Sequence, residues 1–180
     1  MKTKPIIITV FILSALAFKV ATNWVVDSQK SKVQFEASGP MGKVNGSFSG
    51  LKSTVVFDPN NLAGSSIKAS VEVSTIETGI ALRNSDLRNK EEWFNAAKYP
   101  QVTIQSKKIE KTTTGYKMTA DLTIKNVTRP VVIGFNFTPS GNGGLFTSLF
   151  TINREDFGLG KAGGVVGKEV TVNLEVPVSK

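Results

Sequence analysis

The side chains that could do chemistry in this sequence are few, because its 180 residues include no histidine and no cysteine. Serine triads, thiol nucleophiles, disulfides and the usual zinc sites are therefore excluded. Two adjacent carboxylate pairs remain, Glu91-Glu92 and Glu155-Asp156. Glycosidase chemistry needs two carboxylates that converge across a cleft, and nothing in the sequence favours such a cleft for these pairs. We therefore expect no catalytic residue, no metal site and no catalytic cofactor.

A glycine motif and a basic charge balance raise the question of nucleotide or nucleic-acid binding. Residues 158–163 read GLGKAG, which fits the dinucleotide-binding pattern but precedes a strand-like segment where that pattern requires a helix. Lysine and arginine number 22 against 14 aspartate and glutamate residues. Because these cations are scattered along the chain, we interpret the protein as a basic soluble protein and expect no nucleic-acid partner.

Most of the chain after residue 23 alternates apolar and polar residues, as antiparallel strands with one dry face do. Val33, Phe35 and Ala37, for example, share one face of a predicted strand. About eight or nine such strands, joined by turns rich in Gly, Asn and Pro, indicate an all-β barrel or sandwich. Residues 79–98 lack this alternation and predict a short helical insertion that ends before Pro100.

Phenylalanine dominates the aromatic residues, with 11 in the chain, and several occupy the inward positions of predicted strands. A filled core would explain them. However, eight or more strands that close into one barrel can enclose more volume than the side chains fill, which leaves space for one ligand. An apolar cavity of this kind in an exported barrel would suit a lipid carrier.

The N-terminal residues have the layout of a secretory signal peptide. Lys2 and Lys4 precede an uncharged apolar run that ends in small residues at Ala17. The run is shorter than the roughly 20 residues that a membrane-spanning helix needs. Cleavage after Ala17 or after Ala21 fits this layout equally well, and an uncleaved membrane anchor is the alternative. We assign residues 1–21 to a signal peptide and residues 22–180 to one domain, and we expect a periplasmic or secreted protein.

Several short motifs, taken in order along almost the whole mature chain, resemble the YceI-like family of exported polyisoprenoid-binding proteins. The motifs are Trp24-Val25-Val26-Asp27, Gly46-Ser47-Phe48, Val55-Val56-Phe57-Asp58-Pro59, Ser74-Thr75-Ile76-Glu77-Thr78-Gly79, Trp93-Phe94, Lys98-Tyr99-Pro100, Leu122-Thr123-Ile124, Val127-Thr128-Arg129-Pro130-Val131 and Ile152-Asn153-Arg154-Glu155-Asp156-Phe157-Gly158. Each motif alone is unspecific, but their joint order is specific.

The resemblance implies an antiparallel, eight-stranded, lipocalin-like barrel with a short helical insertion around residues 79–98. It also implies that the barrel buries a long isoprenoid chain, of the polyprenyl or isoprenoid quinone type, without catalysis. Two positions depart from the family pattern: Asp86 stands where histidine is common, and Asn126 stands where a hairpin usually has glycine. Asparagine tolerates the left-handed conformation that glycine would adopt, so the turn should form.

We expect the isoprenoid chain to occupy an apolar tunnel formed by inward strand residues and by the helical insertion. The predicted lining residues are Phe35, Phe48, Phe57, Val71, Leu87, Trp93, Phe94, Ile104, Leu122, Ile124, Phe135, Phe150 and Ile152. Arg83, Arg88 and Arg154 are candidates for a polar end that holds the head group, although surface ion pairs would also explain them.

The expected partner is thus a long-chain isoprenoid lipid, either a polyprenyl lipid or a quinone. A transient contact with a membrane surface and a homodimer are further hypotheses. The alternative function is that of a non-enzymatic β-sandwich module, acting in interaction or stress response through its outer surface. The two functions differ in one structural property: a carrier needs a continuous cavity, and the module has a filled core.

Overall fold

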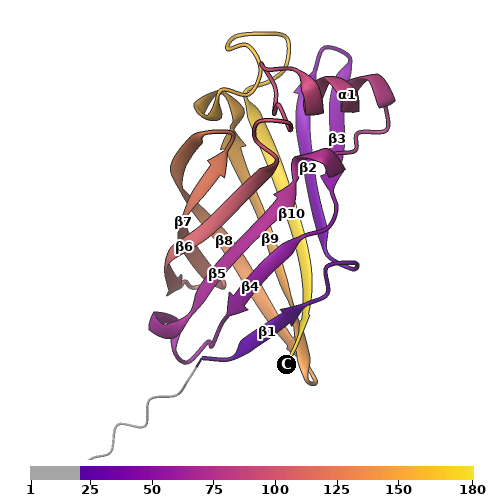
Figure 1. The fold of residues 1–180 in the computed structure, drawn as a ribbon. Helices are drawn as coiled ribbons and strands as arrows, with labels where there is room; N and C mark the ends of the chain where they lie inside the picture. The colour runs from indigo at the N-terminus through magenta and orange to yellow at the C-terminus, as the bar shows by residue number, and fades with distance from the viewer. Residues whose placement is uncertain (1–20) are drawn as a thin grey trace, which may run out of the picture.

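The computed structural model describes residues 21–180, which form an antiparallel β-barrel with one α-helix (Figure 1). The strands are β1 (Asn23–Val26), β2 (Lys32–Gly39), β3 (Gly42–Phe48), β4 (Lys52–Val56), β5 (Ser66–Glu72), β6 (Gln101–Lys111), β7 (Tyr116–Ile124), β8 (Val127–Ser140), β9 (Gly143–Asn153) and β10 (Glu169–Ser179). The helices are α1 (Ala81–Asn89) and the short 3-10 helices η1 (Leu62–Gly64), η2 (Val73–Thr75) and η3 (Arg154–Phe157). The predicted signal peptide, except its last residue, lies outside the described residues.

Eight strands close into a ring, in the order β1-β4-β5-β6-β7-β8-β9-β10, because β1 pairs with both β4 and β10. The β2–β3 hairpin extends the wall along β10, with Val33 opposite Leu174. Ser47 of β3 and Glu77 exchange two backbone hydrogen bonds of 2.9 Å, which join the hairpin to the segment after β5. The predicted eight-stranded antiparallel barrel is therefore confirmed, and the sandwich architecture is not the one that forms.

An aromatic cluster fills the end of the barrel that carries the β8–β9 turn, here called the hairpin end. The Phe57 side chain is fully buried, and its ring centroid lies 5.1 to 5.7 Å from those of Tyr116, Phe135, Phe137 and Phe146. These rings meet mostly edge to face, which is a favourable aromatic arrangement. The hairpin end is therefore a close-packed core without room for a ligand.

The helical insertion between β5 and β6 is confirmed, although only its first half is helical. α1 covers Ala81–Asn89, and turns occupy most of residues 91–98. Asn84 is buried in α1, and its Nδ2 donates a 2.6 Å hydrogen bond to Glu77, while its Oδ1 accepts from the Thr78 backbone and hydroxyl. These polar contacts hold α1 against the barrel.

In the described part of the chain, no helix combines the length and the hydropathy needed to span a membrane.

The turn between β7 and β8 differs from the expectation. The residue with a left-handed backbone is Lys125, at φ 56°, and Asn126 does not have a positive φ. The turn therefore forms as expected, with Ile124 paired to Val127, but its left-handed residue is Lys125 and not Asn126. The Lys125 ammonium group donates a 2.6 Å hydrogen bond to the Glu91 carbonyl, so it links this turn to the segment after α1.

Candidate functional site

The other end of the barrel, here called the α1 end, contains a cavity of about 570 Å³. Its walls come from β2, β3, β5, β6, β7, β9 and β10, and α1 with the segment after it covers part of it. This volume lies within the range of typical small-molecule sites, roughly 300–1,000 Å³. The barrel is thus filled at the hairpin end and hollow at the α1 end.

Strand register explains why the cavity wall is apolar. On one side, Phe35 of β2 pairs with Val172 of β10, which pairs with Phe150 of β9. On the other side, Ile104 of β6 lies between Ala69 of β5 and Leu122 of β7. Side chains of paired residues point to the same face of a sheet, so each row presents three apolar groups to the interior.

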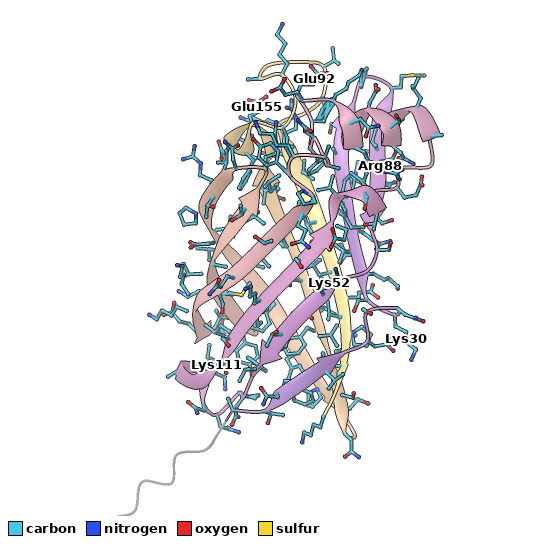
Figure 2. The ribbon with its side chains drawn as sticks, viewed as in Figure 1. Lys30, Lys52, Arg88, Glu92, Lys111 and Glu155 are labelled. Carbon is cyan, nitrogen blue, oxygen red and sulfur yellow. The ribbon has the colours of Figure 1, made fainter. Side chains whose placement is uncertain are left out.

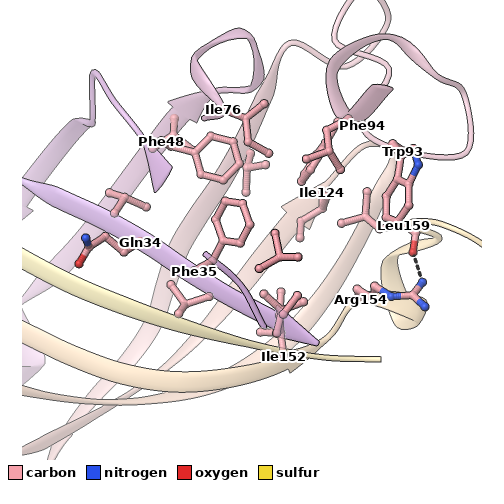
Figure 3. Close-up of a pocket in the computed structure, with 18 of the residues that line it drawn as sticks. Gln34, Phe35, Phe48, Ile76, Trp93, Phe94, Ile124, Ile152, Arg154 and Leu159 are labelled. Atoms are coloured by element: carbon pink, nitrogen blue, oxygen red, sulfur yellow. Dashed lines mark hydrogen bonds between the residues drawn. The ribbon is translucent and has the colours of Figure 1, made fainter. Parts of the chain in front are cut away.

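Three phenylalanines from separate segments form one wall of the cavity (Figure 3). The Phe35 and Phe48 rings are 5.7 Å apart, and the Phe94 ring meets Phe48 edge to face at 6.0 Å. Phe35 covers its cross-strand partner Gly46, where a Cβ atom would overlap the aromatic ring. Glycine at this position therefore lets Phe35 lie flat against the wall, which keeps the cavity open.

The segment after α1 covers the cavity near the β7–β8 turn. Trp93 packs against Gly160, which has a φ of 68° and no space for a side chain beside the indole ring. The Gly160 amide also donates a 2.6 Å hydrogen bond to the Glu92 carbonyl. Leu159 is buried and packs with Trp93 and neighbouring apolar residues. Two irregular segments that are distant in sequence therefore form this cover together.

Most of the predicted lining residues meet in this cavity. Those that line it are Phe35, Phe48, Val71, Leu87, Trp93, Phe94, Ile104, Leu122, Ile124, Phe150 and Ile152. Phe57 and Phe135 do not line it. Both face the barrel interior as predicted, but they lie at the hairpin end, where they pack in the aromatic core.

Several lining residues were not predicted as site residues. Inward-facing strand residues of this kind are Val33, Val102, Val170, Val172 and Leu174. The alternation pattern does place them on inward faces, so it could have identified them. Ile76 and Leu159 also line the cavity, but they lie in connecting segments that carry no periodic signal.

Arg154 lines the cavity, but its guanidinium group is occupied by the protein itself. Its side chain is 3% exposed. Nε donates to the Gly167 carbonyl at 2.9 Å, Nη2 to the Val166 carbonyl at 2.6 Å, and Nη1 to the Leu159 carbonyl. Nη2 also lies 3.3 Å from the Glu155 carboxylate. Arg154 therefore holds the loop between η3 and β10 in place.

The other two predicted arginines differ from each other. Arg88 does not line the cavity; its Nη2 donates a 2.6 Å hydrogen bond to the Ile76 carbonyl, and its Nε is buried without a partner. Arg83 lines the cavity together with Asp86 and Leu87, which follow it by three and four positions on the same face of α1. Within residues 21–180, Arg83 has no hydrogen bond and no ion pair, so its guanidinium group is free to meet a ligand.

Charged groups around the α1 end are of both signs. Figure 2 shows Arg88, Glu92 and Glu155 at this end and Lys111 towards the opposite one.

The Glu77 carboxylate accepts hydrogen bonds from Asn84 and from the Gly79 amide, and these bonds hold its pKa below the usual value. This carboxylate therefore stays ionised and anchors α1 beside the cavity.

A closed antiparallel barrel with an apolar internal cavity defines a class of small-ligand-binding proteins, to which the lipocalins belong. Comparison with known proteins assigns this chain within that class. The family model of the YceI-like domain matches residues 24–178, and the chain belongs to the YceI-like family.

Individual relatives agree with this assignment. A UPF0312 protein of Yersinia enterocolitica is 31% identical over 137 residues, which cover 73% of this chain and 71% of that protein. The crystal structure of BcnA from Burkholderia cenocepacia gives a TM-score of 0.80 at 28% identity and covers 87% of this chain and 100% of BcnA. A polyisoprenoid binding domain from Saccharophagus degradans, implicated in plant cell wall breakdown, gives a TM-score of 0.67 at 16% identity over 88% of this chain and 98% of that domain.

Proposed function

We propose that this protein is an exported carrier that holds a long isoprenoid chain, of the polyprenyl or isoprenoid quinone type, in the cavity at the α1 end. The observation that carries this proposal is the cavity itself: about 570 Å³ enclosed by rows of aliphatic and aromatic side chains. The protein binds its ligand and performs no chemistry on it. The polyisoprenoid binding domain of Saccharophagus degradans, which shares the fold, supports the choice of ligand class.

Burial of the chain supplies the binding free energy. Each methylene-sized group that leaves water gains about 0.8 kcal/mol, so a chain of several isoprene units gains well over 10 kcal/mol before ordering costs. The gain needs no polar partner, which fits a wall made almost entirely of apolar side chains. Ile104 and Phe150 contact both the cavity and the aromatic core, so they form the floor that the chain end reaches.

The head group is placed at the opening, next to Arg83. This arginine is the one of the three candidate arginines that lines the cavity and has no partner among the described residues. Asp86, on the same helix face, forms an ion pair of 2.9 Å with Lys90. A quinone carbonyl or a phosphate oxygen could accept hydrogen bonds from Arg83.

The alternative function, a module with a filled core that acts only through its surface, does not need this cavity. Its expected sandwich architecture also differs from the closed barrel. The export of the protein rests on the predicted signal peptide, and the homodimer stays a hypothesis. We therefore prefer the carrier, located in the periplasm or secreted.

Quenching of Trp93 tests the proposal, because this indole lines the cavity. Trp24→Phe removes the other tryptophan, which lies at the hairpin end. We expect saturable quenching by ubiquinone with an isoprenoid tail, and no quenching by the same quinone head group without a tail. Ala69→Phe should obstruct the cavity and strongly weaken binding, whereas Lys68→Phe, on the outer face of β5, should leave binding unchanged.

Two results would contradict the proposal. Equal quenching with and without the tail would show that the cavity does not recognise the chain. Absence of quenching by the tailed ubiquinone, together with no change in Trp93 emission when a polyprenol is added, would reject the carrier function altogether.

A further inference from the structure

Exposed apolar side chains lie in three separate segments that also contribute to the lining of the cavity. The lining reaches Met41 in the β2–β3 turn, Arg83 in α1 and Val166 in the loop between η3 and β10. Met41 is fully exposed, and Leu82 and Val165, which adjoin the latter two, are 74% and 77% exposed. Figure 1 shows that these three segments lie at the same end of the barrel.

The outer wall of the barrel has no comparable group of exposed apolar side chains among the described residues. Ile80, immediately before α1, is a fourth exposed apolar residue in these segments. The remaining large exposed apolar residues of the described chain are Val25, Val132 and Leu149, which lie on three different strands. Single exposed apolar residues are ordinary on a soluble protein, but a group around an opening marks an interaction site.

The segments that carry these side chains are fixed in position. The Gly167 amide donates a 2.8 Å hydrogen bond to the Ser38 carbonyl, which ties the loop before β10 to β2. Arg154 holds the same loop through the Val166 carbonyl. The backbone of this loop is therefore held beside β2, and its Val165 side chain is 77% exposed.

Two cations stand beside these apolar groups without an acidic partner among residues 21–180. They are Arg83 in α1 and Lys161 in the loop before β10. Glu92 and Glu155 lie at the same end, so we expect apolar contact to supply most of the attraction. Cations next to apolar anchors suit a lipid surface, where they meet head-group phosphates while apolar side chains enter below them.

We propose that Ile80, Leu82, Val165 and Met41, here called the apolar rim, insert shallowly into the surface of a lipid bilayer. The cavity opening then faces the bilayer, and a lipid chain can pass between membrane and barrel without crossing water. The choice of a bilayer as the occupant rests on the proposed function, because an isoprenoid chain is supplied and received by membranes. The four residues and the cations Arg83 and Lys161 belong to segments at one end of the barrel, and apolar side chains next to cations fit a lipid surface.

The test compares two triple variants, each of which replaces three exposed aliphatic residues by glutamine. The rim variant carries Ile80→Gln, Leu82→Gln and Val165→Gln, none of which lines the cavity. The wall variant carries Val25→Gln, Val132→Gln and Leu149→Gln; Leu149 is 69% exposed, close to the 74% of Leu82. The probe is vesicles of phosphatidylcholine and phosphatidylglycerol without any isoprenoid lipid, and binding is measured by co-flotation.

We expect the wild type and the wall variant to bind equally, and the rim variant to bind at least about tenfold more weakly, since it loses three apolar anchors. Equal binding by the rim variant, equal loss in the wall variant, or no binding by the wild type would each overturn the proposal. Lower self-association of the rim variant in sedimentation, without a change in vesicle binding, would instead assign the rim to a contact between two copies.

A separate variant keeps the two proposals apart. Ala69→Phe obstructs the cavity but leaves the rim intact, so it should still bind vesicles even though its quinone uptake is strongly weakened. Loss of vesicle binding in Ala69→Phe would contradict an independent apolar rim. Conversely, a rim variant that still binds detergent-dispersed quinone shows that docking and cargo binding are separate properties.

Discussion

Arg154 and Arg83 both line the cavity, yet their guanidinium groups have different roles. Arg154 is 3% exposed and donates to the carbonyls of Leu159, Val166 and Gly167. Arg83 makes no such contact within the described residues. A residue type that suggests head-group binding in the sequence thus has a structural role at one position and remains free for a ligand at the other.

This difference predicts that substitution by methionine affects mainly stability at Arg154 and mainly ligand binding at Arg83. Arg154→Met should lower the free energy of unfolding by about 3 kcal/mol, because it leaves buried carbonyl groups unpaired. Arg83→Met should change it by less than about 0.5 kcal/mol, as expected for a side chain without partners, but should weaken quinone binding. Urea denaturation and Trp93 quenching measure the two effects. Equal stability loss in both variants would contradict these roles.

Among the elements around the cavity, α1 is held in place by polar contacts. Glu77 accepts hydrogen bonds from Asn84 and Gly79, and its pKa is lowered chiefly by the bond from Asn84. A carboxyl group with a lowered pKa in the folded state stabilises the fold at pH values above its unfolded pKa. This contribution is lost as the pH falls through the lowered pKa of the folded state.

We therefore predict that α1 loosens in acid before the barrel unfolds. Amide hydrogen exchange in Ala81–Asn89 should accelerate, relative to that of β7, as the pH falls below the usual carboxyl value of 4.5. Glu77→Gln should remove this difference, since glutamine does not titrate. Acceleration that is uniform over the barrel, or unchanged in Glu77→Gln, would assign acid sensitivity to other carboxylates.

The elements also show how far the sequence could predict the site. Alternation identified which side of each strand faces inward, so Phe35 and Phe150 were correctly directed to the interior. The alternation does not determine the position of a residue along the barrel axis. That position depends on the register of strand pairing, including the irregularity between Ser106 and Lys108 in the β6–β7 ladder. For this reason Phe57 and Phe135, which have the same local pattern, were assigned to the cavity although they belong to the core.

At the scale of the whole molecule, the barrel has a packed half and a hollow half. Two inward-facing alanines, one in each half, allow the halves to be compared. Ala120 of β7 is fully buried in the aromatic core, whereas Ala69 of β5 lines the cavity. A larger apolar side chain has no room at the first position and has room at the second.

An alanine-to-phenylalanine substitution should therefore lower the free energy of unfolding by different amounts at the two positions. Ala120→Phe should destabilise the protein by at least about 1–3 kcal/mol through overpacking. Ala69→Phe should cost less than about 1 kcal/mol, because the added ring occupies empty volume. Thermal denaturation with ligand-free protein measures both. A comparable loss at the two positions would show that the cavity is not open space in solution.

Native mass spectrometry of the intact protein, purified from its own host without detergent, tests the central claim most directly. The proposed function predicts a species heavier than the polypeptide by the mass of one ligand, and fragmentation of that ligand should show an isoprenoid chain. The Ala69→Phe variant, prepared in the same way, should lack this species. A wild-type protein that carries no ligand, or only ordinary fatty acyl lipids, would contradict the carrier function.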